Sequence, residues 1–359
     1  MPGRVNLIGE HIDYHNLPVL PIAIQRRIHI YFRARDDNRI LAISPRFGKR
    51  EFDWTARLQP SAPGDWENYV KAAAQAIAGK WPVRRGINAG VGSDLPAAAG
   101  LSSSSALLTG LTLALLRANG INPRFEDLMD ILPDGEHFVG TRGGGMDHAA
   151  VLAAEPGSAL LVRFDPVEVE RVPIPPDWAF LAAHSLVTAE KSGAVRDEYN
   201  SRRVAGAKAL EKVGWKSYKE SLRGAEAPPE LKLAPLEAAA FKHVTGEGRR
   251  VLDAAAALRK GDAARFGAAL NASHDSLRDQ LRVSCKELDE LVAIAREAGA
   301  IGARLTGAGF GGFAVIACRR ADRDRIAREL VRRFYANKPA FDASKHLIAV
   351  EPSAGALHV

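Results

Sequence analysis

Residues Pro96–Ala106 read PAAAGLSSSSA and run directly into the apolar segment Leu107–Ala118. A glycine can take backbone angles that are closed to other residues, and the serines that follow suit the start of a helix. The stretch therefore predicts a loop that presents backbone N–H groups at a helix N-terminus, an arrangement that binds anions such as phosphate. An ordinary capped helix behind a flexible loop is the alternative, and this stretch alone does not decide between them.

The composition of the chain bounds its class. Its 359 residues suffice for two domains and a sizeable core, and a hydrophobic content of 47% is ordinary for a globular protein. The longest apolar runs, such as Leu107–Leu116, are too short and too broken to span a bilayer, and the N-terminus lacks the order of a signal peptide. Two cysteines cannot build a disulfide framework. We therefore expect a cytoplasmic protein with no membrane partner.

The net charge of +7 raises the question of a nucleic-acid partner. Lys and Arg are spread along helical segments such as Arg320–Arg333, where Asp and Glu are interleaved with them. This pattern is typical of a solvated helix face, so no nucleic-acid partner is expected. A positive field would equally favour an anionic small substrate.

The beginning of the chain carries a second group of polar residues. Arg4–Gly9 reads as the end of a strand and a glycine turn, after which Glu10, His11 and Asp13 follow within one short loop. Two carboxylates and an imidazole can hydrogen-bond several hydroxyls of a polyol. The alternative is a solvated turn.

The hydrophobic pattern predicts mixed helices and strands. Ile28–Phe32 alternates, Asp36–Asn38 supplies a turn, and Ile40–Ile43 follows, which together predict a β-hairpin. Further strands are expected over residues 87–91, 159–164, 178–184, 313–318 and 347–350. Helices are expected over residues 65–79, 107–118, from 125 onward, through most of 196–277 with a polar break at 224–235, and over 286–298 and 321–335. The last of these elements form a βαβ-like ending.

Two further features bear on a site. Gly143–Gly145 stands directly before Met146 and Asp147, and three glycines indicate either a close approach to the main chain or an unusual direction for Asp147. A flexible linker is the alternative. Trp66 and Tyr69, at helical spacing, belong either to the core or to the wall of a site for a flat ligand such as adenine.

Three glycine-bearing stretches lie at the start, in the first third and near the end of the chain, and none is a P-loop or a dinucleotide-binding motif. Together and in this order they resemble the three motifs of the GHMP kinase superfamily, specifically its galactokinase branch. Arg4–Tyr14 (RVNLIGEHIDY) is similar to the galactokinase signature, Pro96–Ala106 to the phosphate loop, and Arg304–Gly312 (RLTGAGFGG) to the third motif. Further similar stretches lie at residues 65–69, 136–147, 198–203 and 284–289, so the resemblance covers nearly the whole chain.

The resemblance implies an α+β, two-domain GHMP kinase fold. Residues 1–165 would form an N-terminal, ribosomal-protein-S5-domain-2-like α/β sandwich, and residues 166–359 a ferredoxin-like α+β domain. It also implies an enzyme that phosphorylates the anomeric C1 hydroxyl of galactose with ATP and Mg²⁺, and we expect it to act as a monomer. Galactokinases carry a strand ahead of the first motif, so this chain is expected to expose an edge of the N-terminal sheet.

Carried over residue by residue, the resemblance assigns roles. Asp147 would be the catalytic base, and Arg4 would hold it ionised and offset charge on the transferred phosphoryl group. The sugar-binding residues would be Glu10, His11, Asp13, Gly145 and Tyr199. The nucleotide-binding residues would be Pro96, Gly100, Leu101, Ser102, Ser103, Ser104, Trp66 and Gly309. The magnesium contacts would be Ser104 and Glu136.

Three alternatives stay open from the sequence. Asp13–Leu17 lacks the glycines usual in galactokinases, and His148 stands where Gln is usual, which looks closer to the N-acetylgalactosamine kinases of the same branch. A sugar and ATP sensor that has lost turnover is a second alternative, against which Arg4, Asp147 and the serine run argue. A mevalonate or homoserine kinase is a third, and it would leave Glu10–Tyr14 without a role.

Overall fold

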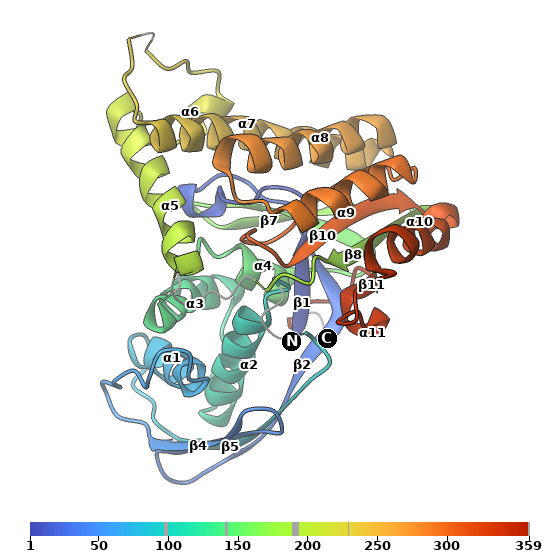
Figure 1. Ribbon diagram of the computed structural model, residues 1–359. Helices are drawn as coiled ribbons and strands as arrows, with labels where there is room; N and C mark the ends of the chain where they lie inside the picture. The colour runs from blue at the N-terminus through green and yellow to red at the C-terminus, as the bar shows by residue number, and fades with distance from the viewer. Residues whose placement is uncertain (97–99, 141–142, 189–193, 229, 358–359) are drawn as a thin grey trace.

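The computed structural model describes residues 1–96, 100–140, 143–188, 194–228 and 230–357 (Figure 1). The strands in these ranges are β1 (Pro2–Asn6), β2 (Pro21–Ala34), β3 (Arg39–Ser44), β4 (Gly48–Asp53), β5 (Ile87–Ser93), β6 (Ser158–Arg163), β7 (Glu168–Pro173), β8 (Trp178–His184), β9 (Gly302–Leu305), β10 (Phe313–Arg319) and β11 (Leu347–Val350). The α-helices are α1 (Glu67–Ala78), α2 (Ser103–Ala118), α3 (Phe125–Val139), α4 (Met146–Ala153), α5 (Ala194–Val213), α6 (Lys219–Leu222), α7 (Pro235–Lys260), α8 (Ala263–Asp275), α9 (Lys286–Glu297), α10 (Arg323–Leu330) and α11 (Ala343–His346). Short 3-10 turns cover Asp13–His15 and Arg320–Asp322, and π-helical turns extend α8 over Ser276–Leu281 and α10 over Val331–Tyr335.

The first sheet has the strand order β1-β2-β5-β3-β4, which corrects the predicted hairpin. β5 lies between β2 and β3, antiparallel to β2 and parallel to β3. The hairpin partner of β3 is instead β4. Sequence alternation shows which face of a strand is buried but not which strand lies beside it. β4 itself was not predicted, because none of its residues is buried and it therefore lacks an alternating apolar pattern. β1 lies at the edge of this sheet, and its Arg4 N–H donates to the carbonyl of Leu101 at 3.2 Å.

Helix α2 fills the inner side of the first sheet. It packs on β2 and is flanked by α1, α3 and α4. Most of its residues are buried, as expected of a helix that is apolar nearly all round. Gly110 permits this close packing, since a Cβ there would lie 2.6 Å from Ile30 Cδ1. The predicted helix after the serine run is therefore confirmed, and its N-terminus points toward the second half of the molecule (Figure 1).

The second sheet has the order β11-β8-β10-β9, with all three pairings antiparallel. β10 and β11 are therefore parallel to each other, with β8 between them. The predicted βαβ-like ending is thus present as a split βαβ unit. The sequence of strand, helices, two strands, helix and strand in this order is the ferredoxin-like arrangement. Helices α8, α9 and α10 pack against its strands.

β6 and β7 form a separate two-stranded sheet, in which β6 packs against β2 and β7 against α7. β7 was not predicted, because most of its residues are exposed and it shows little apolar alternation. The predicted domain boundary between residues 165 and 166 falls in the connection between these two paired strands. Val19 forms an isolated bridge to Val162 of β6. The division into units of 1–165 and 166–359 stays a prediction.

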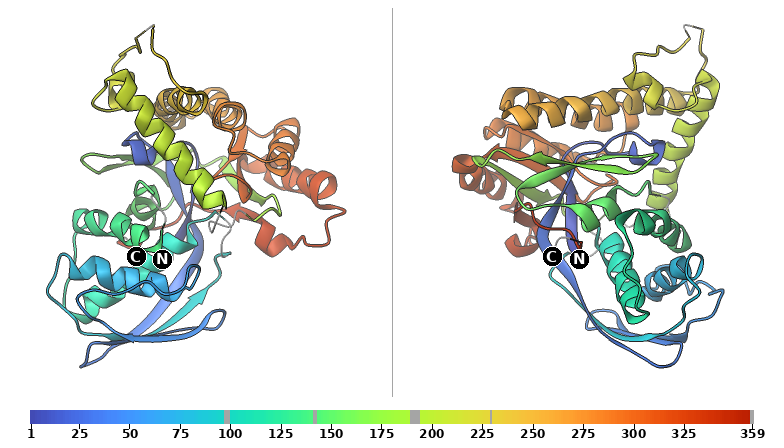
Figure 2. Two further views of the ribbon diagram at one scale, coloured as in Figure 1. Left: turned by 60° about the vertical axis from the view of Figure 1, so that its left-hand side comes forward. Right: turned by 180° about the vertical axis from the view of Figure 1, so that it is seen from behind.

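The two halves of the chain share one of two clusters of buried apolar side chains, and the C-terminal segment returns to the first sheet. A single cluster of buried apolar side chains includes Val5, Leu116, Trp178 and Val244, which belong to β1, α2, β8 and α7. Pro352 bridges to Ile24 of β2, so the last described segment of the chain lies close to the N-terminus (Figure 2).

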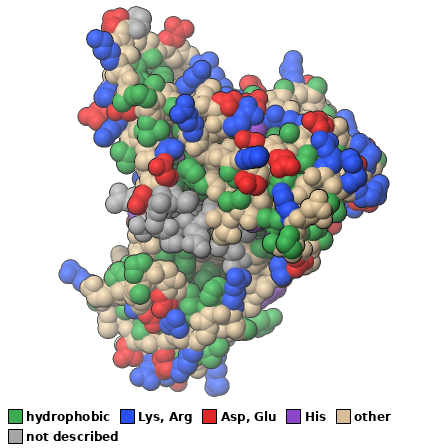
Figure 3. Space-filling model, viewed as in Figure 1, with side chains coloured by type: hydrophobic (Ala, Val, Ile, Leu, Met, Phe, Trp, Pro, Cys, Tyr) green, Lys and Arg blue, Asp and Glu red, His purple; other side chains and the backbone are tan. Residues whose placement is uncertain are grey.

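Charged residues of both signs are interspersed on the face shown in Figure 3. The arginines around α10 pair with acidic neighbours, as Arg325 does with Asp322 and Arg332 with Glu329. This is the arrangement expected of a solvated helix face. Over the ranges that the structure describes, no helix is both long and apolar enough to cross a bilayer.

Candidate active site

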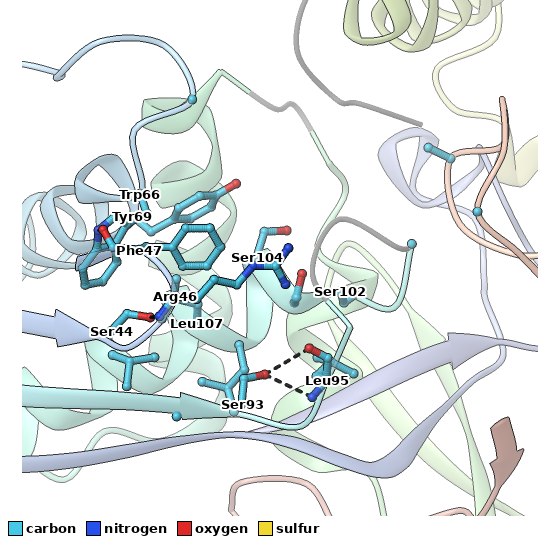
Figure 4. Close-up of a pocket in the computed structure, with 18 of the residues that line it drawn as sticks. Ser44, Arg46, Phe47, Trp66, Tyr69, Ser93, Leu95, Ser102, Ser104 and Leu107 are labelled. Carbon is cyan, nitrogen blue, oxygen red and sulfur yellow. Dashed lines mark hydrogen bonds between the residues drawn. The ribbon is translucent and has the colours of Figure 1, made fainter. Parts of the chain in front are cut away.

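A cavity of about 450 Å³ lies between the first sheet, the start of α2 and the glycine loop that follows β9. Aromatic rings of Phe47, Trp66 and Tyr69 line one side of it, and Ser102 and Ser104 line the other (Figure 4). Trp66 is only 6% exposed, and its indole N–H donates to the Phe47 carbonyl at 3.0 Å. Trp66 is thus both a core residue and part of the cavity wall.

The start of α2 faces this cavity without a side-chain cap. Gly100 and Ser102 have φ values of +78° and +59°, and the helix begins at Ser103. The Ser102 hydroxyl caps no N–H of the helix and has no hydrogen-bond partner among the described residues. Free N–H groups at a helix N-terminus are an anion site, so the geometry favours the first of the two interpretations of this stretch.

The phosphate-loop prediction is only partly covered by the structure. Gly100, Ser103 and Gly309 line the large cavity, whereas Pro96 does not, and Leu101 is buried beneath it. Residues 97–99 lie outside the described ranges, as do residues 141 and 142 of the second glycine stretch.

A second, smaller cavity of about 50 Å³ collects the residues predicted for the sugar. It is lined by Arg4, Glu10, His11, Asp13, Glu136, Gly143, Gly144, Gly145, Met146, Asp147, His148, Tyr199, Gly307 and Ala308. Ala308 lines both cavities, which therefore meet at the glycine loop of the third motif. The polar residues of the small cavity come from β1, the loop that follows it, α3, α4 and α5, which are far apart in sequence.

Glu10 is engaged by the third motif. One carboxylate oxygen accepts from the Gly307 N–H at 2.8 Å and from the Thr306 hydroxyl at 3.2 Å. The other lies 2.5 Å from the fully buried guanidinium of Arg304. Burial raises the pKa of Glu10, although Arg304 opposes that shift. Glu10 thus joins the signature loop to the third motif as well as lining the small cavity, a second role that the sequence did not indicate.

His11 uses both ring nitrogens within the protein. Its Nε2 lies 3.0 Å from the Ala308 carbonyl, which can only accept, so Nε2 carries the hydrogen. Nδ1 therefore accepts from the Tyr14 hydroxyl at 2.8 Å. Burial lowers the pKa of His11 to about 3, which keeps the ring neutral. Tyr199 packs beside it, with ring centroids 5.1 Å apart.

Asp13 shows why a glycine is needed at position 144. Its carboxylate accepts from the Gly144 N–H at 3.1 Å. A Cβ at Gly144 would lie 2.3 Å from the backbone of Asp13 and Tyr14, a distance that no side chain tolerates. The predicted close approach to the main chain is confirmed. Burial, helped by the nearby Asp147, raises the pKa of Asp13 to about 6.

The raised pKa of Asp13 makes a prediction about stability. In the unfolded chain this carboxyl has an ordinary pKa near 3.8, so between about pH 4 and 6 the unfolded state releases a proton that the folded state keeps. Stability is therefore lost as the pH rises through this window, by up to ~3 kcal/mol. We expect Asp13→Asn to raise the free energy of unfolding by about 1–3 kcal/mol at pH 7.5 and by less at pH 5.

Urea unfolding at the two pH values measures this effect. Asp53→Asn is the control, because the Asp53 side chain is 58% exposed in the pair with Arg39. An equal change at both pH values, or a loss of stability at pH 7.5, would contradict the expectation.

Asp147 and Arg4 form the ion pair at the centre of the site. Asp147 is the second residue of α4, placed there by Gly145 with φ +99°. Arg4 Nε lies 2.6 Å from Asp147 Oδ1, and the two side chains are 4% and 17% exposed. Arg4 Nη1 also donates to the Gly100 carbonyl at 2.7 Å. One guanidinium thus contacts both the carboxylate and the loop that opens α2.

The two residues predicted for magnesium lie on different sides of the boundary between the cavities. Ser104 lines the large cavity and is in hydrogen-bonding contact with Tyr69, and Glu136 lines the small one. The serine that contacts Glu136 is Ser105, at 2.5 Å. Sequence reasoning missed Ser105, although its spacing from the buried Thr109 and Thr112 places it on the inner face of α2. No group of three or more His, Cys, Asp or Glu side chains in the described ranges is placed to hold a metal ion.

Comparison with known proteins decides the family. The profiles for the GHMP kinases N terminal domain and the GHMP kinases C terminal match residues 68–155 and 254–337, and that for the galactokinase galactose-binding signature matches residues 2–34. The galactokinase of Chloroflexus aurantiacus is 37% identical over 329 residues, which cover 88% of this chain and 82% of that protein. The chain belongs to the galactokinase family. The galactokinase of Mycobacterium tuberculosis is 35% identical over 92% of this chain and 91% of its own length.

A solved structure of another galactokinase has the same fold. The crystal structure of Lactococcus lactis galactokinase complexed with galactose superposes with a TM-score of 0.85 at 27% identity, covering 99% of this chain and 92% of that one. Mevalonate kinase of L. major shares the fold at 21% identity, with a TM-score of 0.64 over 98% and 94% of the two chains. The galactokinase signature match contains Arg4 and the loop from Glu10 to Asp13, and the N-terminal match contains the serine run and Asp147.

Proposed function

We propose that this chain is an ATP-dependent galactokinase that transfers the γ-phosphoryl group of ATP to the C1 hydroxyl of galactose. The observation that carries the proposal is the Arg4–Asp147 pair, which lies in a small polar cavity where it meets a larger cavity containing the open N-terminus of α2. The relatives named galactokinase support the choice of sugar.

Asp147 is the proposed base. Its Oδ1 accepts a hydrogen bond from Arg4 Nε, and its carboxylate is proposed to accept the proton of the C1 hydroxyl. Arg4 balances the charge of the carboxylate and, at the junction of the cavities, offsets charge that develops on the phosphoryl group. Phosphoryl transfer requires alignment and charge stabilisation rather than covalent chemistry by the protein. The Arg4–Asp147 pair and the N-terminus of α2 are groups of the type that supply these two effects.

The proposed sugar site is the small cavity and the proposed nucleotide site the large one. Asp13 and Tyr199 offer polar atoms to sugar hydroxyls, while His11 and Glu10 shape the wall through their bonds to the third motif. Adenine is proposed to lie against Trp66, with the phosphates at the N–H groups of residues 100–104. Gly309, with φ +79°, brings the third motif to the cavity without a side chain.

Magnesium fits the donor set. Ser104 and Glu136 offer the hard oxygen ligands that Mg²⁺ prefers, and the described residues contain no cluster that would hold the ion by protein ligands alone. This suits a cation that keeps most of its coordination from phosphate oxygens and water. When bound, it neutralises the negative charge of the triphosphate.

An ADP-release screen tests the function. Galactose, N-acetylgalactosamine, glucose, arabinose and fucose are each supplied with Mg-ATP, and we expect galactose to give the highest kcat/KM. Faster turnover of N-acetylgalactosamine than of galactose would identify the protein as an N-acetylgalactosamine kinase instead. Sugar binding by calorimetry without any ADP release would make the protein a sensor.

We propose the monomer as the active unit. Light scattering during size-exclusion chromatography, with activity measured across the peak, checks this.

A further inference from the structure

Ser105 occupies a buried position between two carboxylates of the site. It is the third residue of α2 and has no exposed surface. Its hydroxyl oxygen lies 2.5 Å from Glu136 Oε1 and 3.4 Å from Asp147 Oδ2. Ser105 does not line either cavity, so it reaches the site only through these two side chains.

Further contacts of the two carboxylates show what this hydroxyl does. Asp147 is held by Arg4 through Oδ1, on the oxygen that Ser105 does not approach. Glu136 Oε2 lies against Gly143, where a Cβ would come within 3.0 Å of it. A serine hydroxyl has one proton, and the shorter distance assigns it to Glu136. The hydroxyl therefore fixes Glu136 Oε1 and stands between two groups that repel each other when both are ionised.

His148 completes the surroundings of Glu136. This fully buried ring is in contact with Thr109 through Nδ1 at 3.2 Å, and its Nε2 lies 3.6 Å from Glu136 Oε1. That nitrogen has no hydrogen-bond partner in the described structure. The 2.5 Å contact with Ser105 is thus the short hydrogen bond that orients this oxygen of Glu136.

We propose that Ser105 is a positioning residue for phosphoryl transfer. It anchors Glu136 at a fixed separation from Asp147, so that Glu136 Oε2 stays available to the cation while the Asp147 carboxylate keeps its position for the sugar hydroxyl. The inference rests on the proposed function and adds a residue to it. Ser104, whose side chain is in contact with Tyr69 on the other side, does not share this role.

Removing the hydroxyl is expected to affect the rate and cation binding but not sugar binding. In Ser105→Ala, Glu136 loses its hydrogen bond and turns away from Asp147. We expect kcat to fall by about 10–100-fold, while KM for galactose changes by less than ~3-fold. The Kd of Mn²⁺ in the complex with a non-hydrolysable ATP analogue, measured by electron paramagnetic resonance, is expected to rise about 5-fold or more.

Two further variants separate positioning from packing. Ser105→Cys keeps the size of the side chain but offers only a weak donor, so it should resemble Ser105→Ala if the hydrogen bond matters. Thr112→Val is the matched control, because Thr112 lies two turns further along the same face of α2 and its buried hydroxyl has no partner in the described structure. Melting temperatures of all variants are recorded.

A double-mutant cycle with Glu136→Gln then tests the path of the effect. If Ser105 acts through Glu136, Ser105→Ala should add little in the Glu136→Gln background. Multiplicative effects on kcat, or a Ser105→Cys variant with the kcat and Mn²⁺ affinity of Thr112→Val, would overturn the inference while leaving galactokinase activity intact. A lack of galactose-dependent ADP release by the unsubstituted chain would instead refute the proposed function itself.

Discussion

Asp147→Asn is expected to lower kcat for galactose phosphorylation by about 10²–10⁴-fold, the usual share of a general base. The amide has nearly the shape of the carboxylate, so the small cavity should keep its form. It cannot accept a proton at neutral pH, and the hydroxyl must then be deprotonated by solvent. The Kd values of galactose and of the ATP analogue should stay within about 5-fold, because Asp13 and the α2 N-terminus are unchanged.

Steady-state kinetics and calorimetry on one preparation measure both parts of this prediction. Asp130→Asn is the matched control, since the Asp130 side chain is 70% exposed and pairs with Lys80 at the surface. Turnover within ten-fold of the unsubstituted chain would remove Asp147 from the role of base. A loss of sugar affinity equal to the loss of rate would make it a binding residue instead.

Arg304→Ala is expected to cost about 3–5 kcal/mol of stability, the usual result of removing one partner from a buried ion pair. Arg304 has no exposed surface and lies 2.5 Å from Glu10 and 3.9 Å from Glu247, both of which are buried. It also donates to the backbone carbonyls of residues 6 and 7. Without it, two buried carboxylates face each other with one cation fewer between them.

Chemical denaturation gives this free energy directly. Arg319→Ala is the comparison, because Arg319 lies at the end of β10 and its pair with Asp177 is 44% and 61% exposed. Exposed pairs contribute about 0–1 kcal/mol, so the two arginines should differ several-fold. If Arg304→Ala cost no more than Arg319→Ala, the buried network would not be what joins the first and third motifs.

The sequence was informative where a pattern is local. The apolar face and serine start of α2, the helical run after residue 196 and the strand Trp178–His184 all have signals within one element. It was less informative about neighbours, as the insertion of β5 between β2 and β3 shows, because alternation fixes the buried face and leaves strand order open.

The same distinction holds within the site. Motif order pointed to Arg4 and Asp147, which the structure brings to 2.6 Å. It could not separate Ser104 from Ser105, because adjacent helix positions differ by about 100° around the axis and only the packing of α2 shows which one faces Glu136. Nor could it show that Glu10 is bonded to Gly307, a contact across almost 300 residues.

The bonds between the first and third motifs also set an order of events during synthesis. Arg4 and Asp147 are both present once the first half of the chain has been made, but the loop at residues 6–10 also bonds to Thr306, Gly307 and Glu247. Folding dominated by such distant contacts is slow. A nascent chain halted before residue 300 would therefore carry the reacting pair and this loop but lack Thr306 and Gly307, so activity should appear only after nearly the whole chain has left the ribosome.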